Sequence, residues 1–386
     1  MKPHRFERML CAPGLAVLAL GLGAQRLAAQ LNFSQTNLVS DVPGMAMHTD
    51  ANLVNPWGVA YSASSPIWVS DADAGKATVY TGGGSAVPLV VDVKLPSGGA
   101  AAPTGQIFNS NASAFNGDRF IFATEDGTIA GWRGPLGTST ETLFDSSGAG
   151  ASYKGLAVSN AGANTYLYAA NFTQGRIDVM KSTGAPDLPG SFTDPNLPAG
   201  YAPFNVQNVN GTLYVTYAHT SDEVGEEQAG AGLGVVDAYD LNGNLLQRVA
   251  AGGPLNAPWG VTVAPAGFGK FGGDLLVGNF GDGTINVFEP ASGALLGTLT
   301  DAHGNPIVID GLWSIAFGNG ATGARPDWLY FTAGIDDEAH GLVGRLSAIP
   351  EPAMTGAFGA LGLAALCGLS WWRRRIRAGC DGATSG

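Results

Sequence analysis

Short runs of apolar residues, separated by Gly, Asp, Asn and Pro, recur along the chain and indicate β-strands joined by tight turns. The clearest example is the segment 257–299, which contains four runs of strand length. Between its second and third runs, Asp282-Gly283 supplies residues that tolerate positive φ, which a tight hairpin requires. The segment is therefore predicted to form a four-stranded antiparallel meander.

Weaker copies of this meander fill the chain, and their openings lie 47 to 55 residues apart. A period near 50 residues with four strands in each repeat is typical of β-propeller blades. We therefore predict an all-β fold over residues 30–349, a six-bladed β-propeller of four-stranded blades. A pair of β-sandwiches is the alternative, which the period disfavours. The corresponding positions in the six units are Trp57, Thr104, Lys154, Phe204, Trp259 and Trp313.

The sixth unit contains only three apolar runs before Ile349. The early run 37–41 is apolar and of strand length, and it belongs to no other unit. We expect this N-terminal strand to complete the sixth blade and close the ring, because an unpaired strand edge would invite aggregation.

The net charge of the chain limits the kinds of partner that it can bind. The chain of 386 residues has a formal net charge of −12. The body alone, residues 30–349, holds 11 Lys and Arg against 28 Asp and Glu, a net charge of −17. Such an acidic body excludes nucleic acid as a partner and suits divalent cations. The cysteines, at positions 11, 367 and 380, all lie outside the body, which excludes a disulfide framework or a cysteine metal site there.

Residues 1–29 have the features of a secretory signal peptide. Lys2, Arg5 and Arg8 precede an apolar core, and Ala29 offers a small residue at the expected cleavage site. The body is therefore predicted to be exported.

The C-terminal segment 350–377 predicts a membrane span. The uncharged stretch 353–372 matches the thickness of a bilayer's hydrocarbon core, and the arginines after it favour the cytoplasmic side. The motif residues around it are Pro350, Glu351 and Pro352 before the stretch, and Arg373, Arg374 and Arg375 after it.

This order of features resembles the PEP-CTERM sorting tail of bacterial proteins. The resemblance implies export by the secretion machinery, anchoring in the inner membrane, and processing by an exosortase-type sorting enzyme. The protein would then reside at the cell surface or outside the cell. The extra residues 378–386 depart from the pattern, and a plain membrane anchor is the alternative.

The body also resembles a family of uncharacterised PEP-CTERM proteins predicted to be propellers. The matching stretches are 37–41, 52–58 and 268–283, and they imply no established activity. More loosely, the repeat is similar to six-bladed propellers of the lactonase and calcium-dependent phosphotriesterase group. No clear motif of that group is present, so no catalytic residue is assigned.

Candidate ligand-binding residues open the units, because innermost propeller strands begin near the central channel. Trp57, Trp259 and Trp313 could stack on sugar rings, with Lys154 at the equivalent position of the third unit. The alternative is that these tryptophans pack between blades as scaffold.

A metal site is the second candidate. Asn55, Asn205 and Asp310 are of the residue types that hold Ca²⁺, which prefers carboxylate and amide oxygens. The alternative role for Asn and Asp is turn formation. Ca²⁺ is the one cofactor that these residues suggest.

These observations favour a surface or matrix-associated binding module over an enzyme. Its partner would be a glycan, such as an exopolysaccharide, or a surface protein. The alternative function is a Ca²⁺-dependent hydrolase of the lactonase or esterase type, acting at the central channel. A purely structural role in the matrix is a third interpretation.

Overall fold

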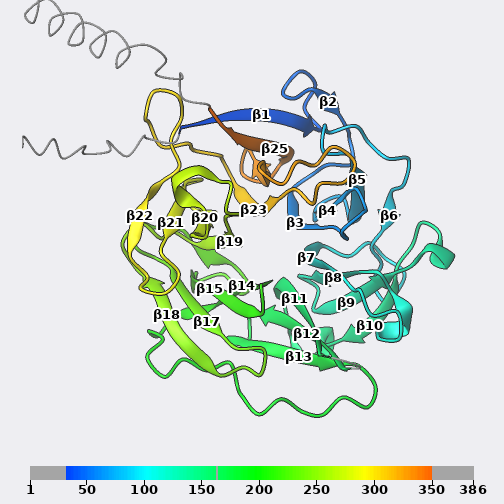
Figure 1. Ribbon diagram of the computed structural model, residues 1–386. Helices are drawn as coiled ribbons and strands as arrows, with labels where there is room; N and C mark the ends of the chain where they lie inside the picture. The colour runs from blue at the N-terminus through cyan, green and yellow to red at the C-terminus, as the bar shows by residue number, and fades with distance from the viewer. Residues whose placement is uncertain (1–31, 162–163, 350–386) are drawn as a thin grey trace, which may run out of the picture. The chain divides into compact units, whose positions relative to one another are not determined.

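Each repeated unit forms one antiparallel sheet, and six such sheets are arranged around a common axis (Figure 1). The computed structural model describes residues 32–161 and 164–349. Within each sheet, most strands pair with their neighbours in sequence, which is the meander that the Gly- and Asp-rich turns predict. The six-bladed β-propeller is thus confirmed, and the two-sandwich alternative is wrong.

The first three blades run outward from the axis in chain order. Their strands are β3 (Pro56–Ala60), β4 (Ile67–Asp71), β5 (Lys76–Tyr80) and β6 (Val91–Asp92) in the first blade, β7 (Pro103–Phe108), β8 (Phe120–Thr124), β9 (Thr128–Trp132) and β10 (Glu141–Asp145) in the second, and β11 (Tyr153–Ala161), β12 (Asn164–Asn171) and β13 (Arg176–Lys181) in the third. Short 3₁₀ turns lie beside them at η1 (Phe115–Gly117), η2 (Gly134–Leu136) and η3 (Ser147–Ala149).

The last three blades follow the same plan with two additions, a short strand in the fourth and an N-terminal pair of strands in the sixth. Their strands are β14 (Tyr201–Val209), β15 (Thr212–Thr220), β16 (Glu227–Gln228), β17 (Val235–Tyr239) and β18 (Leu245–Ala251) in the fourth, β19 (Pro258–Val263), β20 (Leu275–Asn279), β21 (Ile285–Phe288) and β22 (Leu295–Thr298) in the fifth, and β23 (Leu312–Phe317), β24 (Leu329–Ile335), β25 (His340–Ala348), β1 (Phe33–Ser40) and β2 (His48–Thr49) in the sixth. The turn η4 (Gly269–Phe271) precedes β20.

The N-terminal strand closes the ring, as the sequence predicts. β1 pairs antiparallel with β25, with Phe33 opposite Ala348 and Ser40 opposite Leu342. Figure 1 shows this pairing of the earliest and latest described strands. Because both ends of the described chain lie in one sheet, opening the ring requires breaking a full strand ladder.

The third blade differs from the prediction of four strands in every blade. It has three strands, and the segment 182–200 that follows forms none. Four prolines between positions 186 and 198 explain the difference, because proline cannot donate to a strand ladder. The segment is held instead by the buried Asp194, which forms an ion pair with Arg248 of β18.

Glycine after the repeated position brings neighbouring blades close together. A Cβ on Gly58 would lie 2.5 Å from the carbonyl oxygen of Thr104, and one on Gly260 would lie 2.6 Å from that of Trp313. The innermost strands of adjacent blades could not approach so closely with any larger residue. This explains why Gly follows Trp57 and Trp259 in the sequence, and it positions the repeated side chains around the axis.

The predicted signal peptide and sorting tail lie outside the described residues. Among residues 32–161 and 164–349, no helix is long and apolar enough to cross a membrane. The predicted span 353–372 falls beyond this part of the chain, so it stays a prediction.

Candidate binding site at the channel mouth

The tryptophans at the repeated position meet at the axis of the propeller. Trp57 stacks on Trp313 with ring centroids 3.4 Å apart, and Trp259 meets Trp57 and Trp313 edge-on at 6.1 and 5.8 Å. Their exposed fractions are 2 %, 3 % and 0 % for Trp57, Trp259 and Trp313. Because the rings contact one another rather than solvent, they form an aromatic plug at the centre, where a sugar ring has no free indole face to contact.

Asn55 connects this plug to the end of the channel where the innermost strands begin. Its Oδ1 accepts hydrogen bonds from the indole nitrogens of both Trp57 and Trp313, each at 3.1 Å. Its amide nitrogen donates to Asp73 at 3.4 Å and to Glu338 at 3.3 Å. Asn55 has a φ of 46°, a left-handed conformation that Asn tolerates better than most residues.

Lys154 occupies the repeated position of the third blade, and its ammonium group is the centre of an ionic cluster. Its Nζ lies 2.9 Å from Glu125, 3.3 Å from Glu227 and 3.7 Å from Glu226. Burial by itself would lower the pKa of Lys154, but Glu227, Glu125 and Glu226 outweigh it and raise that pKa above its ordinary value. Lys154 is therefore charged, although its side chain is only 2 % exposed.

The carboxylates around Lys154 and Asn55 come from hairpins of four different blades. Each hairpin joins the second strand of its blade to the next strand, so all of them lie at the end of the channel where the innermost strands begin. We call this set the acidic mouth. It consists of Asp73 after β4, Glu125 after β8, Glu226 and Glu227 in the insertion after β15, and Glu338 after β24.

Glu338 is a carboxyl group of the acidic mouth with a strongly raised pKa. Burial, followed by repulsion from Glu227, raises the pKa of Glu338 to about 8, against a smaller lowering by Lys154. Burial also raises the pKa of Asp73, while its hydrogen bond from Asn55 acts in the opposite direction. Burial is the main cause of both shifts, so the acidic mouth disfavours the ionised form of the carboxyl groups at these two positions.

The turn that carries Glu338 has an unusual backbone. Asp336, Asp337 and Glu338 have φ values of 57°, 51° and 65°, three successive non-glycine residues in the left-handed region. Such strain persists only where surrounding contacts maintain it, and it is concentrated at functional sites in proteins generally.

The residues considered for calcium do not share a site. Asn205 donates its amide to the carbonyl oxygen of Trp259 at 2.9 Å, and its Oδ1 accepts from the backbone of Val206 at 2.8 Å. Asp310 accepts from the backbone N–H of Asp336 at 2.9 Å and lines a cavity of the sixth blade. Within the described ranges, no group of three or more His, Cys, Asp or Glu residues is arranged to hold a metal ion.

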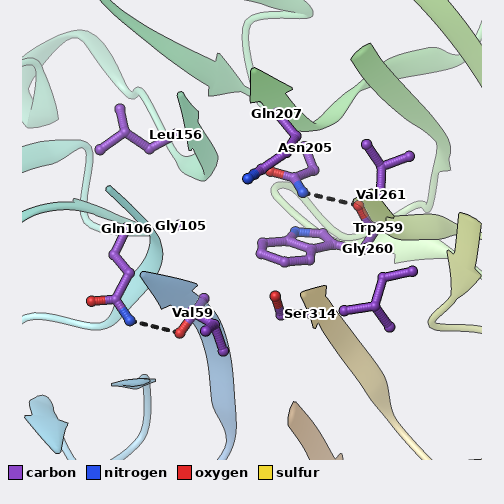
Figure 2. A pocket seen from close by; sticks show the side chains of 12 residues that line it. Val59, Gly105, Gln106, Leu156, Asn205, Gln207, Trp259, Gly260, Val261 and Ser314 are labelled. Atoms are coloured by element: carbon purple, nitrogen blue, oxygen red, sulfur yellow. Dashed lines mark hydrogen bonds between the residues drawn. The ribbon is translucent and has the colours of Figure 1, made fainter. Parts of the chain in front are cut away.

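A narrow space lies beside Trp259 of the plug and is lined by residues of the innermost strands. Figure 2 shows the Trp259 indole lying across this space between Asn205 and Ser314, with Gln106 on the facing strand. At the opposite end from the acidic mouth, a cavity of about 430 Å³ is lined by the far ends of the innermost strands, including Tyr61, Phe108 and Gln207. The plug therefore separates two unlike ends, one acidic and one mostly uncharged.

Sequence reasoning found Lys154 and the tryptophans but missed the acidic mouth. The available signal was that Asp73, Glu125 and Glu338 each follow the second strand of a unit. The acidic insertion at positions 222–227 was visible as well. The linear pattern does not show that these hairpins converge on Lys154 and Asn55.

Comparisons with known proteins show that the chain is similar to two uncharacterized proteins of a virus. No family model matches it. An uncharacterized protein of Acanthamoeba polyphaga mimivirus is 31 % identical over 366 residues, which covers 88 % of this chain and 87 % of the relative. A second uncharacterized mimivirus protein is 30 % identical and covers 80 % of this chain and 84 % of its own length. The chain belongs to this family. The printed names of these relatives assign no activity, so the family relationship supplies no substrate.

Two solved structures are similar to this chain, and the similarity supports the β-propeller fold only. The soluble aldose sugar dehydrogenase of Escherichia coli has a TM-score of 0.52 at 13 % identity, covering 82 % of this chain and 100 % of that one. A glucose dehydrogenase has a TM-score of 0.50 at 12 % identity, covering 83 % of this chain and 100 % of its own. At such identities the likeness concerns the fold and not the chemistry.

Proposed function

We propose that the chain is an exported binding module that recognises a positively charged partner through its acidic mouth. The observation that supports this most directly is the excess of carboxylates there. Three of the five lie around the single buried ammonium group of Lys154, and the other two accept hydrogen bonds from Asn55, above a channel closed by tryptophan. Charge at such a surface steers an oppositely charged partner and sets specificity. A basic patch of a surface protein fits this chemistry better than a sugar ring, because the aromatic faces are already occupied.

The direction of the last described strand supports presentation of this surface. The turn after β24 belongs to the acidic mouth, and β25 then runs for nine residues to Ala348. At about 3.3 Å per residue, Ile349 lies roughly 30 Å away at the other end of the blade. A C-terminal anchor beginning there would leave the acidic mouth facing away from the membrane.

The sorting tail belongs to the same proposal. We propose inner-membrane anchoring through 353–372, then processing by an exosortase-type enzyme and residence at the cell surface or outside it. Its support is the order of Pro350, Glu351, Pro352, the apolar stretch and Arg373 to Arg375. Replacing Pro350 and Pro352 with Ala should retain the protein in the membrane fraction of the producing cell. Unchanged release of the variant would contradict exosortase sorting.

A decalysine peptide is a suitable probe of the acidic mouth, with the producer's exopolysaccharide as the competing ligand. The variant Asp73→Asn with Glu125→Gln and Glu226→Gln should bind decalysine at least about tenfold more weakly than the parent. A matched control, Asp145→Asn with Glu289→Gln and Asp301→Asn, removes the same charge from fully exposed carboxylates elsewhere. Equal losses in both variants would show that only net charge matters. Parent-level binding by the mouth variant, or retention on the polysaccharide alone, would overturn the proposal.

A second candidate function, hydrolysis at the same mouth, is favoured by Glu338. A half-buried carboxyl group with a pKa near 8 beside Asn55 and Lys154 has the properties of a general acid or base. On this hypothesis, Glu338→Gln abolishes turnover of lactone or ester substrates while decalysine binding persists. A parent protein that turns over none of a lactone and ester panel would exclude it.

A further inference from the structure

A cavity of about 560 Å³ opens on the blade that closes the ring, and its lining includes Asp336 but none of the carboxylates of the acidic mouth. We call it the seam cavity. Its floor is apolar and buried, consisting of Ile309, Ile335 and Leu342. Its volume lies within the range of pockets that bind small molecules.

Two apolar side chains beside the floor are left in contact with solvent. Met45 is 44 % exposed and Val308 is 63 % exposed, and both line the cavity. They come from segments far apart in sequence, the loop after β1 and the loop before β23. Because covering apolar surface is favourable, these side chains provide an apolar wall for a bound group.

The polar side of the seam cavity is negatively charged. Asp310 and Asp336 both line it, and Asp310 accepts a hydrogen bond from the backbone N–H of Asp336 at 2.9 Å. Among the residues that the structure describes, no Lys, Arg or His forms an ion pair with either carboxylate. His340 also lines the cavity, but its Nδ1 is 2.7 Å from Asp41 and is engaged there.

We propose that the seam cavity binds a small organic cation, an ammonium group attached to an apolar body of about ten heavy atoms. The carboxylates of Asp310 and Asp336 bind the ammonium group, while Met45, Val308 and the floor contact the apolar body. This inference goes beyond the proposed function, because it uses none of the carboxylates of the acidic mouth. The two can therefore fail separately.

Phenethylammonium is the probe, and 3-phenylpropionate, of similar shape and opposite charge, is its control. The full chain is labelled with ¹³C at its methionine methyl groups, so that Met45 reports on the cavity and the buried Met180 reports on the rest of the fold. We expect phenethylammonium to shift the Met45 signal in a saturable way at millimolar or lower concentration. Phenylpropionate should bind at least about tenfold more weakly.

Two variants test the charged part and the apolar part of the seam cavity separately. Asp310→Asn with Asp336→Asn should weaken phenethylammonium binding at least tenfold, and Val308→Ser should weaken it severalfold, both with an unchanged unfolding temperature. Asp145→Asn, far along the chain in the second blade, should have no effect. The proposal is overturned if Met45 does not respond at 10 mM probe, or if the two probes bind equally. An unchanged affinity in the Asp310 and Asp336 double variant would overturn it as well.

Discussion

Trp57 and Trp313, from the first and sixth blades, stack with their rings 18° apart and donate their indole N–H groups to the same oxygen, Oδ1 of Asn55. One amide thus joins the two blades that meet where the ring closes. The same residue contacts Asp73 and Glu338 with its nitrogen. The aromatic plug and the acidic mouth are therefore parts of one hydrogen-bonded unit.

Replacing Asn55 with Ala should destabilise the protein by about 2–4 kcal/mol, because two buried indole N–H donors lose their acceptor. Chemical denaturation with urea measures the change. Asn210 also has a left-handed φ, of 53°, but its side chain is exposed. Asn210→Ala therefore reports the backbone cost alone and should lose less than about 1 kcal/mol. Equal losses in the two variants would show that the shared acceptor contributes nothing.

Replacing Lys154 with Met should cost about 3–5 kcal/mol at neutral pH, because the buried carboxylate of Glu227 loses its counter-charge. Burial already raises the pKa of Glu227, and losing the opposing effect of Lys154 should raise that folded-state pKa further above its unfolded value. Groups with a raised folded pKa stabilise the fold below the unfolded pKa and lose that contribution as pH rises. The deficit of the variant should therefore shrink between pH 8 and pH 5. Thermal unfolding across this range tests the trend, and a deficit that grows on acidification would contradict it.

Glu338 should make the parent protein less stable in mildly alkaline solution. Its pKa is raised from 4.5 to about 8, so its contribution is full below pH 4.5 and is lost as pH rises through 8. Glu338→Gln removes this dependence and should be more stable than the parent at pH 9, by on the order of 2 kcal/mol after solvent screening. Glu289→Gln, at a fully exposed site, serves as the control. Parallel pH–stability curves for the parent and Glu338→Gln would refute the shift.

A disulfide bond can join β1 to β25, the two strands whose pairing closes the ring. Ser34 of β1 lies opposite Ser347 of β25, with their hydroxyl oxygens 3.0 Å apart. The pair Ser34→Cys and Ser347→Cys should form a disulfide and raise stability by about 2–5 kcal/mol, because it closes a very long loop. Unfolding with and without reductant measures the gain, and Ser34→Cys alone is the control. A reductant-insensitive unfolding temperature in the oxidised double variant would show that strand separation is not part of unfolding.

The sequence by itself determined the fold. Alternating apolar runs and turn residues are local properties, since the pleat of a strand and the geometry of a hairpin depend on neighbouring residues. Their regular spacing then set six blades, and the surplus strand at 37–41 matched the incomplete sixth unit. The glycines after Trp57 and Trp259 are visible in the sequence. The structure supplies the reason for them, which is the close approach of adjacent innermost strands.

Only the tertiary structure decided what the repeated position does. A linear pattern does not record which way each blade turns its side chains around the ring. It favoured a scaffold between blades for Trp57 and Trp313 but left a sugar platform open. The ring brings them together on the axis, where they contact each other. It also gathers Glu125, Glu227 and Glu338 from separate blades around Lys154 and Asn55. Those contacts depend on the closure of the whole propeller, which no single repeat contains.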